Sequence, residues 1–164
     1  MVRVTVAHLG LDRMTNTPVV VLKEDGGDRT LQIWIGAPEA NAIALELRGE
    51  KPARPMTHDL LKSMVQGLGG TLRRVTITGL KDNTYFAELL VFRGEHPFEI
   101  DARPSDSIAL ALRFDAPIFV AEDLFRTDDD GPSGSAAGPD QADPDALKRF
   151  LSKLDPEDLG RFQP

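Results

Sequence analysis

The strongest constraint on the fold is an internal repeat. The segment from Ile35 to Arg48 aligns without a gap onto the segment from Ile100 to Arg113, and both follow strand-like stretches. In each copy, apolar residues recur at the spacing of one buried helix face. The turn residues at 16–17 (Asn-Thr) recur at 83–84. We therefore expect two strand-strand-strand-helix units, joined by a helix for which Thr57 is the expected N-cap.

This order of elements predicts an α+β domain with a mostly antiparallel sheet packed on helices. Val2, Val4 and Val6 alternate with polar residues, as in a half-buried strand. In the first repeat copy, Ala40, Ile43, Ala44 and Leu47 are expected to form one buried stripe. The expected strands are 2–9, 19–23, 30–35, 71–78, 85–92, 97–100 and 117–120, and the expected helices are 38–48, 57–68 and 105–114.

The composition divides the chain into three parts. Residues 1–126 carry the periodic patterns and are expected to form one domain. Residues 127–142 are rich in Asp, Gly, Ser, Pro and Ala without apolar periodicity, which predicts a flexible acidic linker. Residues 143–164 are expected to form a helical tail, with Leu147, Phe150, Leu151 and Leu154 on one side. Such a short helix needs a surface to dock on.

Charge and composition narrow the class of protein. The net charge of −7 argues against broad electrostatic capture of nucleic acid, although it leaves room for a local basic groove. The sequence contains no cysteine, so disulfides, thiolate nucleophiles and cysteine zinc sites are excluded. Because no apolar run is long enough to span a bilayer, we expect a cytoplasmic protein without membrane contact.

Three stretches resemble the signatures of the bifunctional nuclease domain family. They are residues 54–61 (Arg-Pro-Met-Thr-His-Asp-Leu-Leu), residues 101–113 (Asp-Ala-Arg-Pro-Ser-Asp-Ser-Ile-Ala-Leu-Ala-Leu-Arg) and residues 35–45. The resemblance extends from about Val2 to Phe125. It implies a compact α+β domain that acts as a DNase and RNase on nucleic acid, and that forms a homo-oligomer, with a dimer favoured.

The polar residues of these stretches are suited to phosphodiester cleavage. His58 titrates near neutrality and can serve as acid or base, while Arg54 and Arg103 can clamp a phosphate. Carboxylates can hold Mg²⁺, here Asp59, Asp101 and Asp106, with Glu39 a weaker candidate. The expected catalytic residues are His58, Asp59, Arg103 and Asp106, the expected substrate-binding residues are Arg54, Thr57 and Ser105, and the expected metal ligands are Asp101 and Asp106.

Each assignment has a structural alternative. Arg54 and Arg103 can form ion pairs with Asp101 and Asp106 that fix loops to helices. His58 can bond a neighbouring loop. Thr57 and Ser105 can be helix caps, and Glu39 fits an acid favoured by the helix dipole. If these alternatives hold, the chain is a non-catalytic regulatory module that binds an anion or a partner. The sequence leaves this choice open.

Overall fold

The computed structural model describes residues 1–125 and 142–154 of the chain. The strands are β1 (Val2–Asp12), β2 (Thr17–Glu24), β3 (Thr30–Trp34), β4 (Gly70–Lys81), β5 (Thr84–Arg93), β6 (His96–Ala102), β7 (Ile118–Val120) and β8 (Ala142–Asp143). The helices are α1 (Ala37–Leu47), α2 (Thr57–Gly67), α3 (Pro104–Phe114), the 3-10 helix η1 (Glu122–Phe125) and α4 (Pro144–Lys153). In the described ranges, no helix is long and apolar enough to cross a bilayer.

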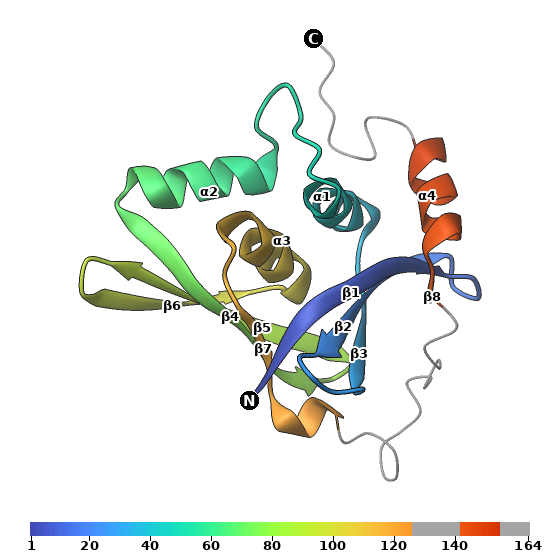
Figure 1. The fold of residues 1–164 in the computed structure, drawn as a ribbon, viewed down its shortest axis with the longest axis horizontal. Helices are drawn as coiled ribbons and strands as arrows, with labels where there is room; N and C mark the ends of the chain where they lie inside the picture. The colour runs from blue at the N-terminus through green and yellow to red at the C-terminus, as the bar shows by residue number, and fades with distance from the viewer. Residues whose placement is uncertain (126–141, 155–164) are drawn as a thin grey trace.

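One sheet carries the whole fold. Its strand order is β3-β2-β1-β7-β4-β5-β6, with β8 paired to β1. Neighbouring strands are antiparallel except β4 and β7, which are parallel. Figure 1 shows α1, α2 and α3 on one face of this sheet. The predicted α+β class with a mostly antiparallel sheet is therefore confirmed, whereas the duplication of two units stays a prediction.

The two meanders β1–β3 and β4–β6 meet at the short strand β7. Val2, Val4, Leu9 and Leu11 of β1 are buried in the core, and Val6 is partly buried against it. The hairpin between β4 and β5 turns at Asp82 and Asn83, both with positive φ, a conformation that these residue types tolerate. Three residues of β7 thus join two local units into one sheet.

Helices α1 and α3 pack side by side on the sheet (Figure 1). Each has a proline in its first turn, where the missing N–H costs nothing. Ala40, Ile43 and Ala44 are buried, as expected, but Leu47 is 45% exposed. The prediction for Leu47 was wrong because α1 ends there, beyond the cover of its neighbours.

Helix α2 differs from its expected start. Met56, not Thr57, is the N-cap residue, and the carboxylate of Asp59 accepts a hydrogen bond from the Met56 amide at 2.9 Å. A carboxylate at the third helical position can satisfy this free N–H, so no hydroxyl cap is needed. The inward face of α2 carries His58, Lys62 and Val65, while most of its large apolar residues face outward.

The C-terminal segment is docked on the domain. Strand β8 pairs with β1, and Leu147 and Leu151 of α4 belong to the core. Asp143 caps α4 by accepting hydrogen bonds from the amides of Asp145 and Ala146, and it also pairs with Arg13. The predicted tail helix is present over 144–153. Of the predicted linker, Ala142 lies in β8, and the remaining residues lie outside the described ranges.

Gly10 provides a test of this docking. A Cβ at Gly10 would lie 2.4 Å from the backbone of Ala142, whereas one at Gly79 would meet nothing within 4 Å. We expect Gly10→Ala to displace β8 and lower the free energy of unfolding by about 1–3 kcal/mol, measured by urea denaturation. The matched variant Gly79→Ala should lie within about 0.5 kcal/mol of the wild type. Equal stability of the two variants would contradict the close approach.

Candidate functional site

The first turns of α1, α2 and α3 converge at one place and bring together charged side chains from all three. Arg103 is extended and precedes Pro104, which begins α3. Gly36 occupies the same place before α1, and a Cβ there would lie 2.2 Å from the carboxylate of Glu39. The glycine therefore leaves the space into which the Glu39 side chain folds.

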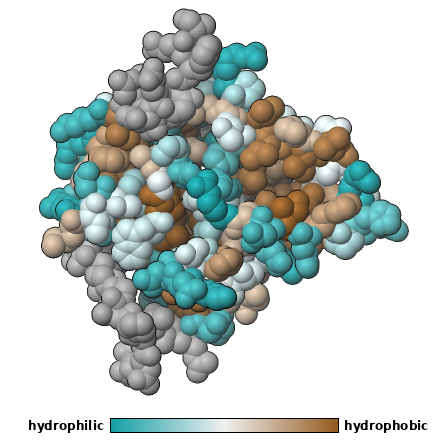
Figure 2. All heavy atoms as spheres, turned by 180° about the vertical axis from the view of Figure 1, so that it is seen from behind, coloured by the Kyte–Doolittle hydropathy of each residue, from teal (hydrophilic) through white to brown (hydrophobic). Residues whose placement is uncertain are grey.

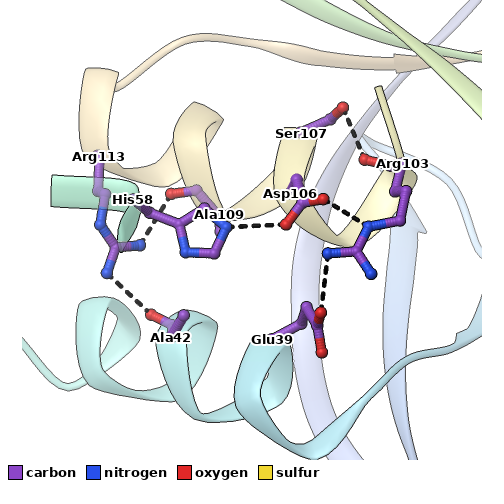
Figure 3. Close-up of polar contacts among 8 residues, drawn as sticks. All are labelled: Glu39, Ala42, His58, Arg103, Asp106, Ser107, Ala109 and Arg113. Atoms are coloured by element: carbon purple, nitrogen blue, oxygen red, sulfur yellow. Dashed lines mark hydrogen bonds and ion pairs between the residues drawn. The ribbon is translucent and has the colours of Figure 1, made fainter. Parts of the chain in front are cut away.

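Four side chains form a continuous polar chain, which we call the Arg103 network: Glu39, Arg103, Asp106 and His58. Arg103 donates from Nε to Asp106 Oδ2 at 2.6 Å and from Nη2 to Glu39 Oε1 at 2.8 Å. The other oxygen of Asp106 lies 3.0 Å from Nε2 of His58. Figure 3 shows the Asp106 carboxylate between the imidazole and the guanidinium. Residues 48 positions apart, His58 and Asp106, thus share one hydrogen bond.

Exposure differs sharply along the Arg103 network. The side chain of Arg103 is 67% exposed, whereas that of His58 is only 9% exposed. Arg103 Nη1 has no hydrogen-bond partner among the described residues, so its two N–H groups are available to an anion. Asp106 uses both oxygens within the network. Arg103 is therefore an exposed cation whose guanidinium is hydrogen-bonded to the carboxylates of Asp106 and Glu39.

Arg103 and Asp106 each stabilise the ionised form of the other. Burial of the Asp106 carboxyl raises its pKa, but hydrogen bonds from Arg103 and His58 outweigh burial, and the pKa of Asp106 lies below its usual 3.8. The hydrogen bond to Asp106 raises the pKa of Arg103 above its usual value. At neutral pH, Asp106 is an anion and Arg103 a cation.

A second cluster is centred on the buried side chain of Arg113. Arg113 of α3 donates to the carboxylate of Asp59 at 2.7 Å and to the carbonyl oxygens of Ala109 at 2.9 Å and Ala42 at 3.2 Å. Lys62 of α2 donates to the carbonyl of Arg113 at 2.5 Å. One guanidinium thereby connects α1, α2 and α3.

The remaining predicted residues are placed apart from the Arg103 network. Arg54, Thr57 and Asp101 are exposed, and no ion pair or hydrogen bond joins them to the network. Ser105 is buried at the second position of α3, so it is not the N-cap. The expected pairing of Arg103 with Asp106 is confirmed, and its second partner is Glu39 rather than Asp101.

Sequence reasoning missed Arg113 and undervalued Glu39. Arg113 falls three and four residues after the buried Leu110 and Ala109, so a charge on the apolar stripe of α3 was the available signal. The pairing of Glu39 with Arg103 could not be predicted from the sequence, because the two residues come together only when α1 packs beside α3. Asp59, predicted to be catalytic, is the carboxylate that pairs with Arg113.

The predicted Mg²⁺ site does not have a matching cluster of ligands. Over residues 1–125 and 142–154, no group of three or more His, Asp or Glu side chains is arranged to hold a metal ion. Asp106 already binds Arg103 and His58 with its two oxygens. The Mg²⁺ requirement, with Asp101 and Asp106 as ligands, therefore stays a prediction from the sequence.

Removal of Arg113 tests its structural role. We expect Arg113→Met to lower the free energy of unfolding by roughly 3–5 kcal/mol, because it leaves Asp59 half-buried without its cation. Arg48→Met, which breaks an exposed pair with Glu50, is the matched control and should cost at most about 1 kcal/mol. Chemical denaturation of both variants measures the difference. Similar costs would show that Arg113 is not a structural anchor.

The Asp59–Arg113 pair also predicts a dependence of stability on pH. Burial raises the pKa of Asp59, but hydrogen bonds from Arg113 and the Met56 amide outweigh it, so the pKa falls below 3.8. A lowered pKa contributes stability that is complete above 3.8 and is lost as the pH falls through the folded-state pKa. The melting temperature of Asp59→Asn should therefore approach that of the wild type as the pH falls from about 5.

The control for this prediction is Asp28→Asn, which removes a fully exposed carboxylate of the same charge. Its melting temperature should follow that of the wild type at every pH. A constant difference between Asp59→Asn and the wild type across the acid range would contradict the coupling.

Comparison with known proteins places this architecture in a family. A family model, the bifunctional nuclease domain, matches residues 20–130. An uncharacterized protein of Mycobacterium tuberculosis is 39% identical over 97% of this chain and 98% of its own length. Bifunctional nuclease 1 of Arabidopsis thaliana is 32% identical over 68% of this chain, and bifunctional nuclease 1 of Oryza sativa subsp. japonica is 29% identical over 66%. The aligned part is about a third of each plant protein, 35% and 34%. The chain belongs to the bifunctional nuclease domain family.

Proposed function

We propose that this protein is a nuclease that hydrolyses phosphodiester bonds in both RNA and DNA. Family membership supports this proposal, and the plant relatives carry the name bifunctional nuclease. The observation that carries it is the Arg103 network, which places an exposed guanidinium beside a histidine–carboxylate pair (Figure 3).

In this proposal, Arg103 binds the scissile phosphate. Its Nη1 group is open, and the guanidinium matches the geometry of phosphate oxygens. The ion pairs with Asp106 and Glu39 already restrict the Arg103 side chain. Binding of a phosphate therefore costs little further side-chain entropy. Positive charge positioned before the reaction stabilises the charge that develops on the phosphorane.

His58 is the proposed proton carrier. If its Nε2 carries the proton that lies toward Asp106, Nδ1 is left as an acceptor for a proton from the attacking water. Because the His58 side chain is largely buried, proton transfer to it requires close approach of the water or substrate.

The proposal also includes the substrate-binding residues and the Mg²⁺ ligands that were predicted from the sequence. Arg54 is exposed and without a polar partner in the described part of the chain, so it is available to the nucleic-acid backbone. Thr57 and Ser105 flank the network in sequence. A Mg²⁺ requirement, with Asp101 and Asp106 as ligands, and a cytoplasmic location rest on the sequence alone.

A cleavage assay with a matched arginine variant tests the proposal. Arg103→Ala should lower the rate on single-stranded RNA and DNA by roughly 100-fold, the usual cost of one group that stabilises transition-state charge. Arg29→Ala is the control, because Arg29 also bridges two glutamates, Glu24 and Glu122, away from the network. Its rate should equal that of the wild type.

Two further measurements complete this test. His58→Gln should lose the rate without losing binding of the oligonucleotide, and added EDTA reports whether a divalent cation is needed. Wild-type rates in Arg103→Ala, at equal purity, would identify a contaminating nuclease and refute the assignment.

The enclosure of His58 favours a second candidate function, a non-catalytic module that binds an anion. Nη1 of Arg103 is open to an anion, but His58 is largely enclosed, which limits its access to a proton of the substrate or water. This candidate predicts no cleavage of either nucleic acid. It also predicts a rise in melting temperature with phosphate or an oligonucleotide in the wild type and in Arg29→Ala, but not in Arg103→Ala.

A further inference from the structure

The two sides of the sheet differ in chemistry over β4, β5 and β6. On the side that α1, α2 and α3 occupy, the exposed side chains include Met64 and Phe98, and Figure 2 shows hydrophobic side chains gathered over the half of the molecule that holds α2 and β6. We call the opposite side of these three strands the outer face. It combines aromatic side chains with arginines that have no ion pair among the described residues.

The alternation of β5 decides which of its side chains lie on the outer face. Leu89 and Val91 belong to the core, and successive side chains of a strand point to opposite sides of the sheet. Phe86, Leu90 and Phe92 therefore lie on the outer face, away from α1, α2 and α3 (Figure 1). Phe86 is 41% exposed and the other two are half-buried, so this part of the sheet has an accessible apolar surface.

A β-bulge in β4 adds two arginines to the same face. The pairing of β4 with β5 shifts between Leu72 and Arg74, which leaves Arg73 as the extra residue. Arg74 is opposite Leu90, so it lies on the outer face. The guanidinium of Arg73 lies 5.9 Å from the centre of the Phe92 ring, on that face as well. In a regular strand, two consecutive side chains would point to opposite sides, and a bulge can re-aim one of them.

The charges of the outer face are separated by strand. Both arginines of β4 are exposed and have no ion pair in the described part of the chain. The acids lie toward the other border: Glu99 of β6 is opposite Leu90, and Asp101 of β6 is opposite Glu88. The face is therefore cationic along β4, apolar in the middle of β5 and anionic along β6. A ligand with phosphates on one side and flat rings on the other is complementary to this order.

We propose that the outer face of β4 and β5 binds single-stranded nucleic acid, with Arg73 and Arg74 on phosphates and Phe86 and Phe92 against bases. As the binding surface for the substrate of a nuclease, it rests on the proposed function. Base stacking on aromatic side chains requires bases that are unpaired. The six residues from Phe86 to Phe92 span about 20 Å at roughly 3.3 Å per residue, and an open sheet with aromatic residues holds two or three bases.

This mode of binding fits a substrate of either sugar. Every base has an aromatic face in RNA and in DNA, and a contact that does not involve the 2′-hydroxyl does not distinguish the two. Double-stranded nucleic acid fits poorly, because its bases are already stacked and its binding depends on the backbone charge. The net charge of −7 disfavours binding by charge alone.

The strand register connects the outer face with the Arg103 network. Phe86 precedes Ala87, and Ala87 is opposite Ala102, the last residue of β6. Arg103 follows directly and begins the network. A strand that is stacked along β5 thus reaches the end of β6 at which the proposed phosphate-binding arginine lies.

Fluorescence anisotropy tests the proposal on the full chain, with fluorescein-labelled oligothymidylate and oligouridylate of twelve nucleotides. Phe92→Ala should weaken binding of both about tenfold, the usual effect of one stacked base. The double variant Arg73→Gln/Arg74→Gln should lower the slope of log K against log salt by about 1.4, since each phosphate contact contributes about 0.7 on a single strand. Arg93→Gln is the matched control, because Arg93 lies 5.8 Å from the Phe98 ring on the helix side, and it should bind as the wild type does.

A duplex of the same length should bind at least about tenfold more weakly than the single strands. Phe86→Ala, at a more exposed position, repeats the stacking test, and circular dichroism confirms that each variant is folded. Wild-type affinity in the arginine double variant and in both phenylalanine variants, equal binding of the duplex, or no binding of either oligonucleotide by the wild type would overturn the proposal. Cleavage is scored separately on a gel. Binding that depends on the outer face without cleavage would refute only the nuclease, and cleavage with unchanged binding in the variants would refute only the outer face.

Discussion

The buried guanidinium of Arg113 is the interaction on which the helical layer depends. It is held by the carboxylate of Asp59 and by carbonyl oxygens of α1 and α3, so one residue connects three helices. A buried cation is tolerated only where its donors find acceptors, and this requirement fixes where α2 and α1 lie relative to α3. Because His58 precedes Asp59, the same anchor places His58 within reach of Asp106.

The Arg103 network takes its geometry from that anchored layer. Arg103 and Asp106 come from one helix start, which sequence proximity ensures, whereas Glu39 and His58 come from two other helices. The resulting arrangement gives an exposed cation with a lowered-pKa carboxylate beneath it. This combination supports both binding of a phosphate and a role for histidine as a proton carrier.

The apolar core is covered by the C-terminal segment near β1 but has exposed apolar side chains at β6. Near β1, the C-terminal segment adds β8 and α4, whose leucines complete the core, and Gly10 permits this close approach. This segment lies outside the 20–130 range of the family match. At β6, neither α4 nor any other described element covers the apolar edge. The chain thus covers one part of its core with its own C-terminal segment and leaves Phe98 and Ile100 exposed at the other.

The sequence by itself determined the local structure. Alternating valines, Asp82-Asn83 at a hairpin and prolines in first helical turns each depend on a few neighbouring residues, so the α+β class and most elements could be predicted. The Arg103–Asp106 pair spans three residues and was predictable for the same reason. Only the tertiary structure decided that β7 joins the two meanders, that Glu39 reaches Arg103, and that Arg113 lies inside. Those contacts depend on how the helices pack over the sheet. A periodic pattern in the sequence indicates which face of a helix is buried, but it does not indicate which residues that face contacts.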